Sequence, residues 1–517
     1  MNHKIIQIFF KIQVLLLAVL LAAACTDDAW DQHYQANPEI VSSQNLWQTI
    51  DSIPELSSFA SVLKKYGYDK FLSQTQAFTV FAPDNDAMAL LDTTNMDVEK
   101  ELIKNHIARF ILPASGSSSN IIATLNGKRI VLQYNDGKYY YGNAIFASSI
   151  SSLVASNGIV HVLNSYEQFF PNIWEYIGKT AGLDSIRKYL YSFDELIFNE
   201  EASVPGSIVN GQQTYLDSVM INYNMLLSKL GNINSEDSSY TMIVPDNAAW
   251  TEAYNRIKDY FVYYDSDKRV ADSLQRINTS YALVQDLIYS NKTQKSTKDS
   301  ITSTSDHTFY NPQTLLDGTK ITTSNGAAYI TSLLKIDALD SWHVQLKTEA
   351  ERTVGRVNTL STSYTLRSPA GVSNISAGRY LKLEPTTSSG NPTVTFDIHD
   401  NLSNFYDVYC VFVGQKLVNA NATGVKDTCK VYFNLNYMEQ DGSTVVKRCP
   451  ASGVIKTNPS KLDTVLVASG FKFPVANYGE EDANVTLKVI SNVSRSETTN
   501  YSRELLIDCI LLKPGKQ

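Results

Sequence analysis

Residue types that could carry out catalysis are present in this sequence, but not at the spacings that catalysis requires. The chain has 52 Asp and Glu residues, so carboxylate pairs for acid–base hydrolysis exist, although sequence spacing does not say which of them meet. No GxSxG, HExxH or glycine-rich phosphate-binding motif occurs. The 7 histidines include no pair at the helical spacing of a metal site. We therefore predict no catalytic residue, no metal and no cofactor.

The cysteines are the next candidates for chemistry. Cys410, Cys429, Cys449 and Cys509 all lie in the last quarter of the chain, and no CxxC metal-binding pair occurs. An exported protein permits disulfides, so these four could form one or two. Because Cys410 and Cys509 lie within apolar, strand-like runs, free buried thiols are the alternative.

Aromatic side chains are better candidates for binding than for catalysis. Tyr139, Tyr140 and Tyr141 are consecutive in a hairpin-like segment, and Trp250 follows a buried strand. A tyrosine ring offers apolar area and a hydroxyl, which suits a glycan or a peptide ligand. The alternative is that these rings are half-buried packing residues.

The N-terminus has the pattern of an export signal. Lys4 and Lys11 precede an apolar run that ends in three alanines, and Cys25 follows directly. This pattern resembles the lipobox of bacterial lipoproteins, although Leu21 stands four rather than three positions before the cysteine. The resemblance implies that residues 1–24 are a signal peptide and that Cys25 is lipidated. Ordinary cleavage that leaves an unmodified Cys25 is the alternative.

The residues after Cys25 bear on location. Asp27 and Asp28 resemble the acidic surface-export signal of Bacteroidota lipoproteins, within a tether that we place at residues 25–40. We therefore expect an outer-membrane protein that is held by lipid and faces the cell exterior. The formal charge is −8, and it becomes −10 without Lys4 and Lys11. Such a surface repels phosphate backbones, so nucleic acid is not an expected partner.

The region after the tether predicts an α/β domain. Apolar residues recur at helical spacing from Leu46 to Tyr66, and Pro54 divides this segment into two short helices. A buried strand at 77–82 and a helix at about 98–110 follow. Short strands with turn signals then lead to a second buried strand at 159–163.

Three segments of this region resemble the signatures of fasciclin (FAS1) domains: residues 78–87, 102–107 and 157–163. The resemblance implies that residues 41–172 form one such domain. It also implies that the signature residues are structural, with His161 a buried imidazole and Asp84 and Asn85 a turn and helix N-cap. The signature residues are Thr79, Pro83, Asp84, Asn85, Asn157, Gly158 and His161.

A second, diverged copy follows at residues 173–348. Pro245, Asp246 and Asn247 repeat the first signature, and Tyr329 stands where the first copy has His161. The polar segments 202–217 and 290–307 have no counterpart in the first copy. We expect them to be long loops that face a partner.

The chain beyond about residue 349 predicts an all-β domain. Many short alternating segments, among them 393–398 and 430–437, are separated by turn signals, which is typical of a β-sandwich. Residues 504–514 resemble the closing strand of jelly-roll carbohydrate-binding modules. The fold class we predict is multidomain α+β, with two tandem fasciclin-like domains followed by this sandwich.

This order of domains resembles the fasciclin-domain lipoproteins that Bacteroidota encode beside SusC/SusD-type nutrient importers. The resemblance implies a non-enzymatic surface protein that binds a glycan or a peptide as an accessory of the importer complex. An adhesin that binds host matrix or neighbouring cells is the alternative, and an unrecognised hydrolase is the least favoured. A groove with exposed aromatic rings would favour capture, whereas a flat apolar patch would favour adhesion.

Overall fold

The computed structural model contains two compact units, residues Met1–Phe170 and Pro171–Gln517. It describes residues 43–515 except for 92–95, 116–118, 148–151, 210, 293–298, 359–361, 370–371 and 420–427. The predicted signal peptide, the tether and Cys25 therefore lie outside the described residues. Within them, no helix is both long and apolar enough to cross a membrane.

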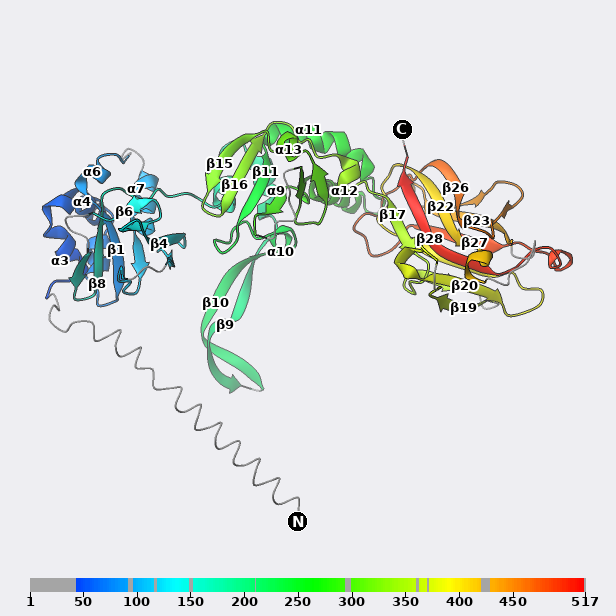
Figure 1. The fold of residues 1–517 in the computed structure, drawn as a ribbon, viewed down its shortest axis with the longest axis horizontal. Helices are drawn as coiled ribbons and strands as arrows, with labels where there is room; N and C mark the ends of the chain where they lie inside the picture. The colour runs from blue at the N-terminus through cyan, green and yellow to red at the C-terminus, as the bar shows by residue number, and fades with distance from the viewer. Residues whose placement is uncertain are drawn as a thin grey trace, which may run out of the picture. The chain divides into compact units, whose positions relative to one another are not determined.

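The first unit is built on a four-stranded sheet with the order β2-β1-β8-β7 (Figure 1). Its central strands, β1 (Phe78–Pro83) and β8 (Gly158–Leu163), are parallel, and every residue of both is buried. A parallel strand covered on both faces is expected to be almost wholly apolar, which explains why Thr79 and His161 are the only polar side chains of the two strands. The outer strands β2 (Ile107–Arg109) and β7 (Ser152–Ala155) are antiparallel to them.

Helices cover one face of this sheet, and a second small sheet covers the other. Phe59 of α4 belongs to the same core as Val80, whereas Phe81, on the opposite face of β1, packs with Tyr141 of the second sheet. The predicted break at Pro54 is confirmed, because the 3-10 turn Pro54–Leu56 separates α3 from α4. The covering elements are α3 (Leu46–Asp51), α4 (Ser57–Lys65), α5 (Tyr68–Leu72), α6 (Asn85–Met88), α7 (Met96–Asn105), β3 (Asn120–Ala123), β4 (Arg129–Asn135), β5 (Lys138–Tyr141) and β6 (Ala144–Ile145).

The second unit begins with the same arrangement. Its sheet has the order β12-β11-β16-β15, and its central strands β11 (Tyr240–Pro245) and β16 (Gly326–Thr331) are again parallel. The strands β12 (Ile288–Ser290) and β15 (Thr319–Thr323) flank them. The helices of this part are α8 (Ile173–Lys179), α9 (Asp184–Tyr191), α10 (Met225–Leu230), α11 (Asn247–Ile257), α12 (Lys268–Val284) and α13 (Pro312–Leu315).

The prediction of a long loop is wrong for 202–217, whereas 290–307, where the structure describes it, consists mostly of turns and bends with one short strand. The first segment is part of a hairpin of two long antiparallel strands, β9 (Asp194–Val209) and β10 (Gln212–Asn224). The second contains β13 (Ser300–Thr302), which pairs with β14 (Thr308–Tyr310). The polar composition suggested loops, but β-prone residues such as Ile197, Phe198 and Ile221 lie in paired positions of the two strands.

The remaining strands form two antiparallel six-stranded sheets, so the predicted β-sandwich is confirmed. Phe412 of one sheet lies near Phe433 of the other, with ring centroids 6.3 Å apart in the shared core. The first sheet contains β17 (Leu346–Glu349), β19 (Thr362–Arg367), β20 (Tyr380–Pro385), β22 (Phe405–Val413), β26 (Leu462–Lys472) and β28 (Leu505–Pro514). The second contains β18 (Arg356–Asn358), β21 (Thr393–Ile398), β23 (Lys430–Met438), β24 (Thr444–Cys449), β25 (Ile455–Lys456) and β27 (Val485–Ser491).

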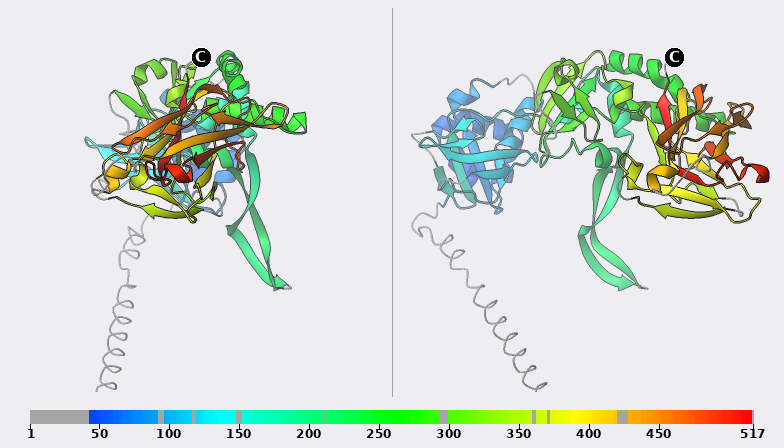
Figure 2. Two further views of the ribbon diagram at one scale, coloured as in Figure 1. Left: turned by 90° about the vertical axis from the view of Figure 1, so that its right-hand side faces the viewer. Right: turned by 45° about the vertical axis from the view of Figure 1, so that its right-hand side comes forward.

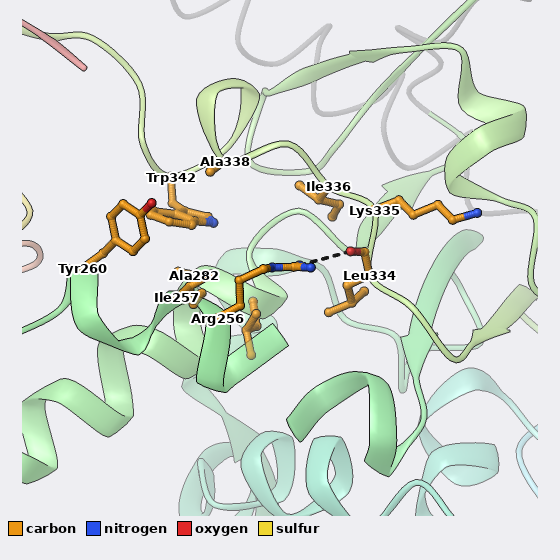
Figure 3. A pocket seen from close by; sticks show the side chains of 10 residues that line it. Arg256, Ile257, Tyr260, Ala282, Leu334, Lys335, Ile336, Ala338 and Trp342 are labelled. Atoms are coloured by element: carbon orange, nitrogen blue, oxygen red, sulfur yellow. Dashed lines mark hydrogen bonds between the residues drawn. The ribbon is translucent and has the colours of Figure 1, made fainter. Parts of the chain in front are cut away.

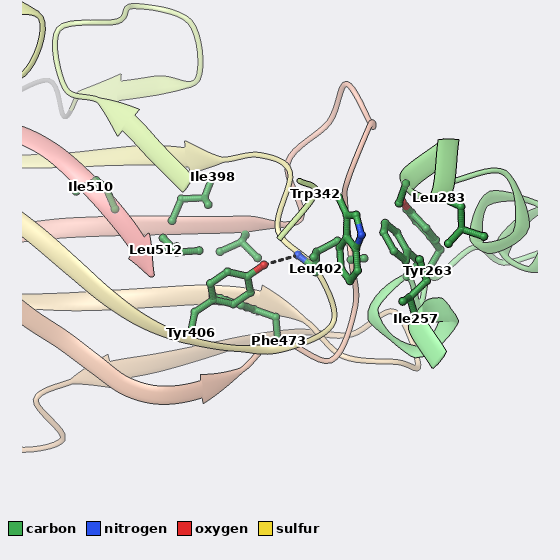
Figure 4. Close-up of a cluster of buried hydrophobic side chains, with 14 of the residues drawn as sticks. Ile257, Tyr263, Leu283, Trp342, Ile398, Leu402, Tyr406, Phe473, Ile510 and Leu512 are labelled. Atoms are coloured by element: carbon green, nitrogen blue, oxygen red, sulfur yellow. Dashed lines mark hydrogen bonds between the residues drawn. The ribbon is translucent and has the colours of Figure 1, made fainter. Parts of the chain in front are cut away.

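The sandwich and the α/β part of the second unit share one continuous core (Figure 4). Trp342 packs against Phe261, with ring centroids 5.4 Å apart, and the Tyr263 hydroxyl donates to the carbonyl of Tyr478 at 2.6 Å. The Tyr406 hydroxyl accepts from the backbone N–H of Leu402 at 3.1 Å. The boundary that we predict between residues 348 and 349 therefore falls inside one compact unit. The division between the two units, at Phe170, lies close to residue 172, the predicted end of the first domain.

Candidate functional site

A groove of about 770 Å³ lies in the second unit, between α9, α11 and α12. We call it the α9–α12 groove. Its lining residues are Ser185, Lys188, Tyr189, Ser192, Phe193, Trp250, Thr251, Tyr254, Asn255, Arg276, Ile277 and Ser280. A cavity of this size accommodates a drug-sized ligand or two to three sugar rings or residues of a peptide.

Local capping interactions place two walls of this groove. Asp246 is the N-cap of α11 and accepts the backbone N–H of Ala249 at 2.8 Å. The next residue, Asn247, accepts the backbone N–H of Ser185 at 2.9 Å and donates to the Asp184 carboxylate at 3.1 Å. The signature residues of the second copy therefore connect the start of α11 to the start of α9.

Four aromatic rings line the groove. Tyr189 and Phe193 come from α9 and the residues after it, and Trp250 and Tyr254 come from α11. The Tyr189 ring centroid lies 5.2 Å from that of Phe193 and 5.8 Å from that of Trp250. All four residues are half-buried and line the groove, so part of each remains accessible to a ligand.

The hydroxyl of Tyr189 is buried and has no hydrogen-bond partner among the described residues. Burial, more than any other cause, raises the pKa of this hydroxyl well above its usual value. An unpaired buried hydroxyl costs roughly 1–3 kcal/mol unless a ligand or a water satisfies it. The groove wall therefore contains a neutral O–H that is buried and not exposed to the groove.

The charges that line the groove are all positive. Lys188 and Arg276 contribute one cation each, and no Asp or Glu is among the lining residues. The guanidinium of Arg276 donates to the Ser273 hydroxyl at 3.2 Å. The groove thus combines an aromatic surface with two cations, which suits a ligand that has apolar faces and negative charge.

A neighbouring cavity of about 500 Å³ shares Tyr189, Phe193 and Ile277 with the groove and extends it towards the sandwich. His307 lines this cavity, and its Nδ1 lies 2.9 Å from the carboxylate of the buried Asp286. The hydroxyls of Ser303 and Ser341 donate to the same carboxylate, each at 2.5 Å. Asp286 is therefore saturated with hydrogen bonds and holds the His307 ring in one orientation.

A third cavity, of about 340 Å³, lies on the other side of α11 and α12 (Figure 3). Arg256 donates to the carbonyl of Leu334 at 3.3 Å across this cavity. Tyr260 and Trp342 form one end, with ring centroids 5.3 Å apart. Because it is smaller and its arginine is already paired with protein, it is a weaker candidate than the α9–α12 groove.

The predicted ligand-binding tyrosines of the first unit are not a binding surface as a group. The prediction is wrong for Tyr141, which is fully buried, stacks on Phe81 at 3.7 Å and donates to the carbonyl of Asn105 at 2.6 Å. Tyr139 and Tyr140 are half-buried, and Tyr139 packs near Phe146 with ring centroids 5.6 Å apart. Successive strand residues face opposite sides, so three consecutive tyrosines cannot line one surface.

Residues of the first signature in the first unit form hydrogen bonds that connect different elements of the fold. The Thr79 hydroxyl donates to the carbonyl of Phe110 at 2.9 Å and accepts the N–H of Leu112 at 2.8 Å. Pro83 ends β1, and Asp84 is the N-cap of α6. Asn85 accepts the N–H of Ser58 at 2.9 Å and donates to the carbonyl of Pro54 at 2.9 Å.

The second signature has the same character. Asn157 accepts the N–H of Leu46 at 2.7 Å and donates to the carbonyls of Leu72 and Gln74. In the second unit, Asn325 accepts the N–H of Ile173 at 3.0 Å and donates to two backbone carbonyls. The two copies therefore share side-chain roles as well as strand order.

His161 is fully buried in the first unit. Its Nε2 lies 2.8 Å from the carbonyl oxygen of Leu112, and its Nδ1 lies 2.8 Å from the Ser152 hydroxyl. Both ring nitrogens are therefore engaged by protein groups, and the geometry gives this side chain a packing role.

The four cysteines are free and buried in the structure. Cys410 pairs with Ile510 and Val411 pairs with Cys509 across β22 and β28. Because paired residues face the same side and consecutive residues face opposite sides, Cys410 and Cys509 are on opposite faces of the sheet and cannot bridge. Of the alternatives left open by the sequence, the structure has the free thiols.

One group of described residues could offer ligands to a metal: Glu349, Asp508 and Cys509, whose ligating atoms lie within 4.8 Å of one another. The ammonium of Lys347 already pairs with Glu349 at 2.8 Å. Asp508 accepts the backbone N–H of Ser376 at 3.0 Å. Burial raises the pKa of Asp508 to about 6, the Ser376 hydrogen bond opposes this shift, and the neighbouring carboxylates reinforce it.

We expect Asp508→Asn to stabilise the sandwich at pH 7 in a buffer that contains a chelator. The folded-state pKa of about 6 exceeds the unfolded value, so this carboxyl favours folding below about pH 4, and that contribution is lost as the pH rises through 6. A shift of this size corresponds to roughly 3 kcal/mol at pH 7. Urea unfolding at pH 4 and pH 7 should show a gain for the variant at pH 7 alone, and equal gains at both values would contradict it.

Sequence reasoning identified Trp250 but missed Tyr189, Phe193, Tyr254 and Arg276. Both aromatic pairs have the i,i+4 spacing that places two rings on one helical face. That spacing was the available signal, but it is equally the pattern of a core-facing stripe. Whether such a stripe is covered depends on the neighbouring helix.

Comparison with known proteins places residues 54–166 in the fasciclin domain family. The chain is 30% identical over 117 residues to protein sll1483 of Synechocystis, an alignment that covers 21% of this chain and 64% of that protein. It is 23% identical over 247 residues to mouse Stabilin-2, covering 44% of this chain and 8% of that protein. The chain thus spans less than two thirds of the length of either relative.

Solved structures with similarity to this chain include two kinds. The FAS1 domain pair of the insect cell adhesion molecule Fasciclin I covers 55% of this chain at 13% identity and a TM-score of 0.21, with 98% of that chain covered. The CBM22-1 xylan-binding domain of Paenibacillus barcinonensis Xyn10C covers 34% of this chain at 10% identity and a TM-score of 0.21, with 94% of that chain covered. At these TM-scores neither likeness assigns a ligand.

The prediction of a fasciclin domain in the first unit is therefore confirmed. A fasciclin domain is a non-catalytic, adhesion-type domain that is typical of extracellular or cell-surface proteins. The family match covers residues 54–166 and shows this domain in the first unit.

Proposed function

We propose that this protein captures an anionic glycan or acidic peptide at the cell surface without chemical turnover. The observation that carries the proposal is the lining of the α9–α12 groove, which combines four aromatic side chains with the cations of Lys188 and Arg276. Aromatic faces stack on sugar rings or apolar side chains, and the ammonium of Lys188 and the guanidinium of Arg276 bind oxygen atoms. This combination supports binding and supplies no nucleophile paired with a base.

The charge of the lining supports the choice of ligand class. Lys188 and Arg276 meet no carboxylate among the lining residues, so an anionic ligand would neutralise them. A neutral glycan would use the aromatic rings and leave both cations solvated. We therefore favour a ligand that contains carboxylates, such as a uronic-acid oligosaccharide or an acidic peptide.

The wider setting is part of the same proposal. In it, residues 173–348 are a second fasciclin-like domain, and residues 349–517 are a jelly-roll sandwich of the carbohydrate-binding-module type. Lipid on Cys25 holds the chain on the outer face of the outer membrane. The protein then acts as an accessory of a SusC/SusD-type importer and passes its ligand to that complex. The repeated strand order and the shared roles of Asn157 and Asn325 support the tandem arrangement.

Adhesion is the competing function, and the family match is compatible with it. A fasciclin-type adhesin would bind host matrix or a neighbouring cell through an extended surface. The concave α9–α12 groove favours capture of a small or extended ligand over flat adhesion.

We expect Trp250→Ala to weaken ligand binding about tenfold, which corresponds to about 1.4 kcal/mol, because the variant removes one wall of stacking area. Isothermal titration of the full chain with oligogalacturonates and with poly-glutamate peptides measures the effect, and neutral xylo-oligosaccharides serve as the comparison. Tyr310→Ala, which truncates a side chain 72% exposed outside the groove, is the matched control. Equal affinity for charged and neutral probes, or an unchanged Kd for Trp250→Ala, would contradict the proposal.

The importer role has a separate test. The tagged full-length protein is purified from gently solubilised outer membranes, and co-purifying proteins are identified by mass spectrometry. Stoichiometric recovery of a SusC/SusD-type pair is expected. Recovery of this protein alone, with intact importer complexes elsewhere in the same sample, would overturn the importer role and leave adhesion as the alternative.

A further inference from the structure

The hairpin β9–β10 is separate from the other sheets in the described part of the chain. Its two strands form a sheet of their own, and no further described strand pairs with either of them. Figures 1 and 2 show it extending from α10 away from the rest of the second unit. At about 3.3 Å per residue its 13-residue strand reaches roughly 40 Å.

Apolar side chains occupy both faces of this hairpin. Phe198 pairs with Met220 on one face, and Ile197 pairs with Ile221 on the other. The exposed fractions reach 68% for Leu196 and 51% for Met220. A strand that is solvated on one face alternates apolar and polar residues, but this hairpin does not.

Such a hairpin is costly to leave uncovered. An isolated two-stranded ribbon is marginally stable in water, and its two outer edges present unpaired backbone N–H and C=O groups. Exposed contiguous apolar surface is typical of an interaction site. The position of the insertion, between α9 and α10 on a rigid stem where Asn224 donates to Asp194 at 2.8 Å, suits a projecting contact element.

The negative charge of the hairpin indicates which kind of partner surface it can contact. Residues 194–224 contain no Lys, Arg or His and five carboxylates: Asp194, Glu195, Glu200, Glu201 and Asp217. A second copy is itself acidic, with a formal net charge of −8, and a contact between two hairpins would bring together ten carboxylates; an anionic lipid surface would also repel the hairpin. A protein groove with an apolar floor and a Lys- or Arg-rich rim complements both properties.

We propose that the β9–β10 hairpin docks into such a cationic, apolar groove on a different protein. This surface is separate from the α9–α12 groove, since no residue from 194 to 224 lines that groove. The proposal therefore stands or falls independently of the ligand proposed above.

The test places a photoactivatable benzoylphenylalanine at Leu196 of the full chain, expressed in its native host. The matched control carries it at Tyr310, which is 72% exposed on β14 of the same unit. A single heteromeric adduct is expected at 196 and none at 310. The cross-linked peptide of the partner should be flanked by Lys and Arg residues.

A charge variant completes the test. Glu195→Gln with Glu200→Gln removes two charges and keeps an acceptor for the Tyr215 hydroxyl, which donates to Glu200 at 2.8 Å. The adduct should fall at least fivefold, while ligand binding at the α9–α12 groove stays unchanged. An adduct with a second copy or with lipid, no adduct, or an adduct that is insensitive to the charge variant would overturn the proposal.

Discussion

Gly158→Ala is expected to unfold the sheet of the first unit while the second unit stays folded. A Cβ at this position would lie 2.0 Å from the carbonyl oxygen of Phe78, its partner on the adjacent parallel strand. Backbone atoms cannot move aside as a flexible side chain can, so β1 and β8 must separate. We expect a loss of about 3 kcal/mol or more, at the upper end of overpacking effects.

The measurement is hydrogen exchange of the full chain by mass spectrometry, with peptides from β1 and β8 compared with peptides from β11 and β16. Gly326→Ala is the corresponding variant of the second unit, because a Cβ there would lie 1.8 Å from the carbonyl oxygen of Tyr240. In this variant we expect faster exchange in β11 and β16 instead. Gly127→Asn is the control, since that turn glycine has φ +80° and open space around it. Wild-type protection of β1 in Gly158→Ala would refute the close approach.

Acidification is expected to destabilise the first unit between pH 6.5 and pH 4. Burial lowers the pKa of both His106 and His161 to about 4, although each has a hydrogen bond to a backbone carbonyl that opposes the shift. The unfolded chain binds more protons across this window, so stability is complete above pH 6.5 and is lost as the pH falls through 4. Each ring accounts for roughly 3 kcal/mol.

The geometry explains why the neutral form is required. His106 Nδ1 lies 2.9 Å from the carbonyl oxygen of Leu102, and Nε2 accepts the backbone N–H of Glu167 at 3.0 Å. Protonation would place two N–H groups against each other in a fully buried site. Nuclear magnetic resonance of selectively labelled histidine should show no titration of either ring above pH 5, and urea unfolding at pH 7 and pH 5 should show the loss. A ring that titrates near pH 6.5 in the folded protein would contradict this account.

Much of the first unit could be predicted from local sequence. The near-continuous apolar runs at 77–82 and 159–163, interrupted only by Thr79 and His161, predicted buried strands, because a strand covered on both faces needs no polar alternation. Asp84 and Asn85 predicted a cap and a turn from their residue types alone. These features depend on neighbours within a few residues, so a single sequence contains the relevant information.

The candidate site could be predicted only in part. Trp250 was identifiable as an aromatic residue near a signature, whereas Tyr141 was chosen as one of three consecutive tyrosines in a hairpin-like segment and is fully buried. The difference is not local: Tyr141 meets Phe81 of the central sheet, and Trp250 faces a groove between helices. Composition likewise suggested a loop where β9 and β10 pair over long stretches.

The sequence by itself determined the order of the domains, the repeated signatures and the acidic charge, since these follow from residue types and short-range periodicity. Only the tertiary structure decided which aromatic rings remain exposed, that Cys410 and Cys509 face opposite sides of a sheet, and that the Tyr189 hydroxyl lacks a partner. Each of these depends on strand register or helix packing between residues far apart in the chain. Many such arrangements satisfy the same local pattern, so burial and pairing are properties of the folded chain as a whole.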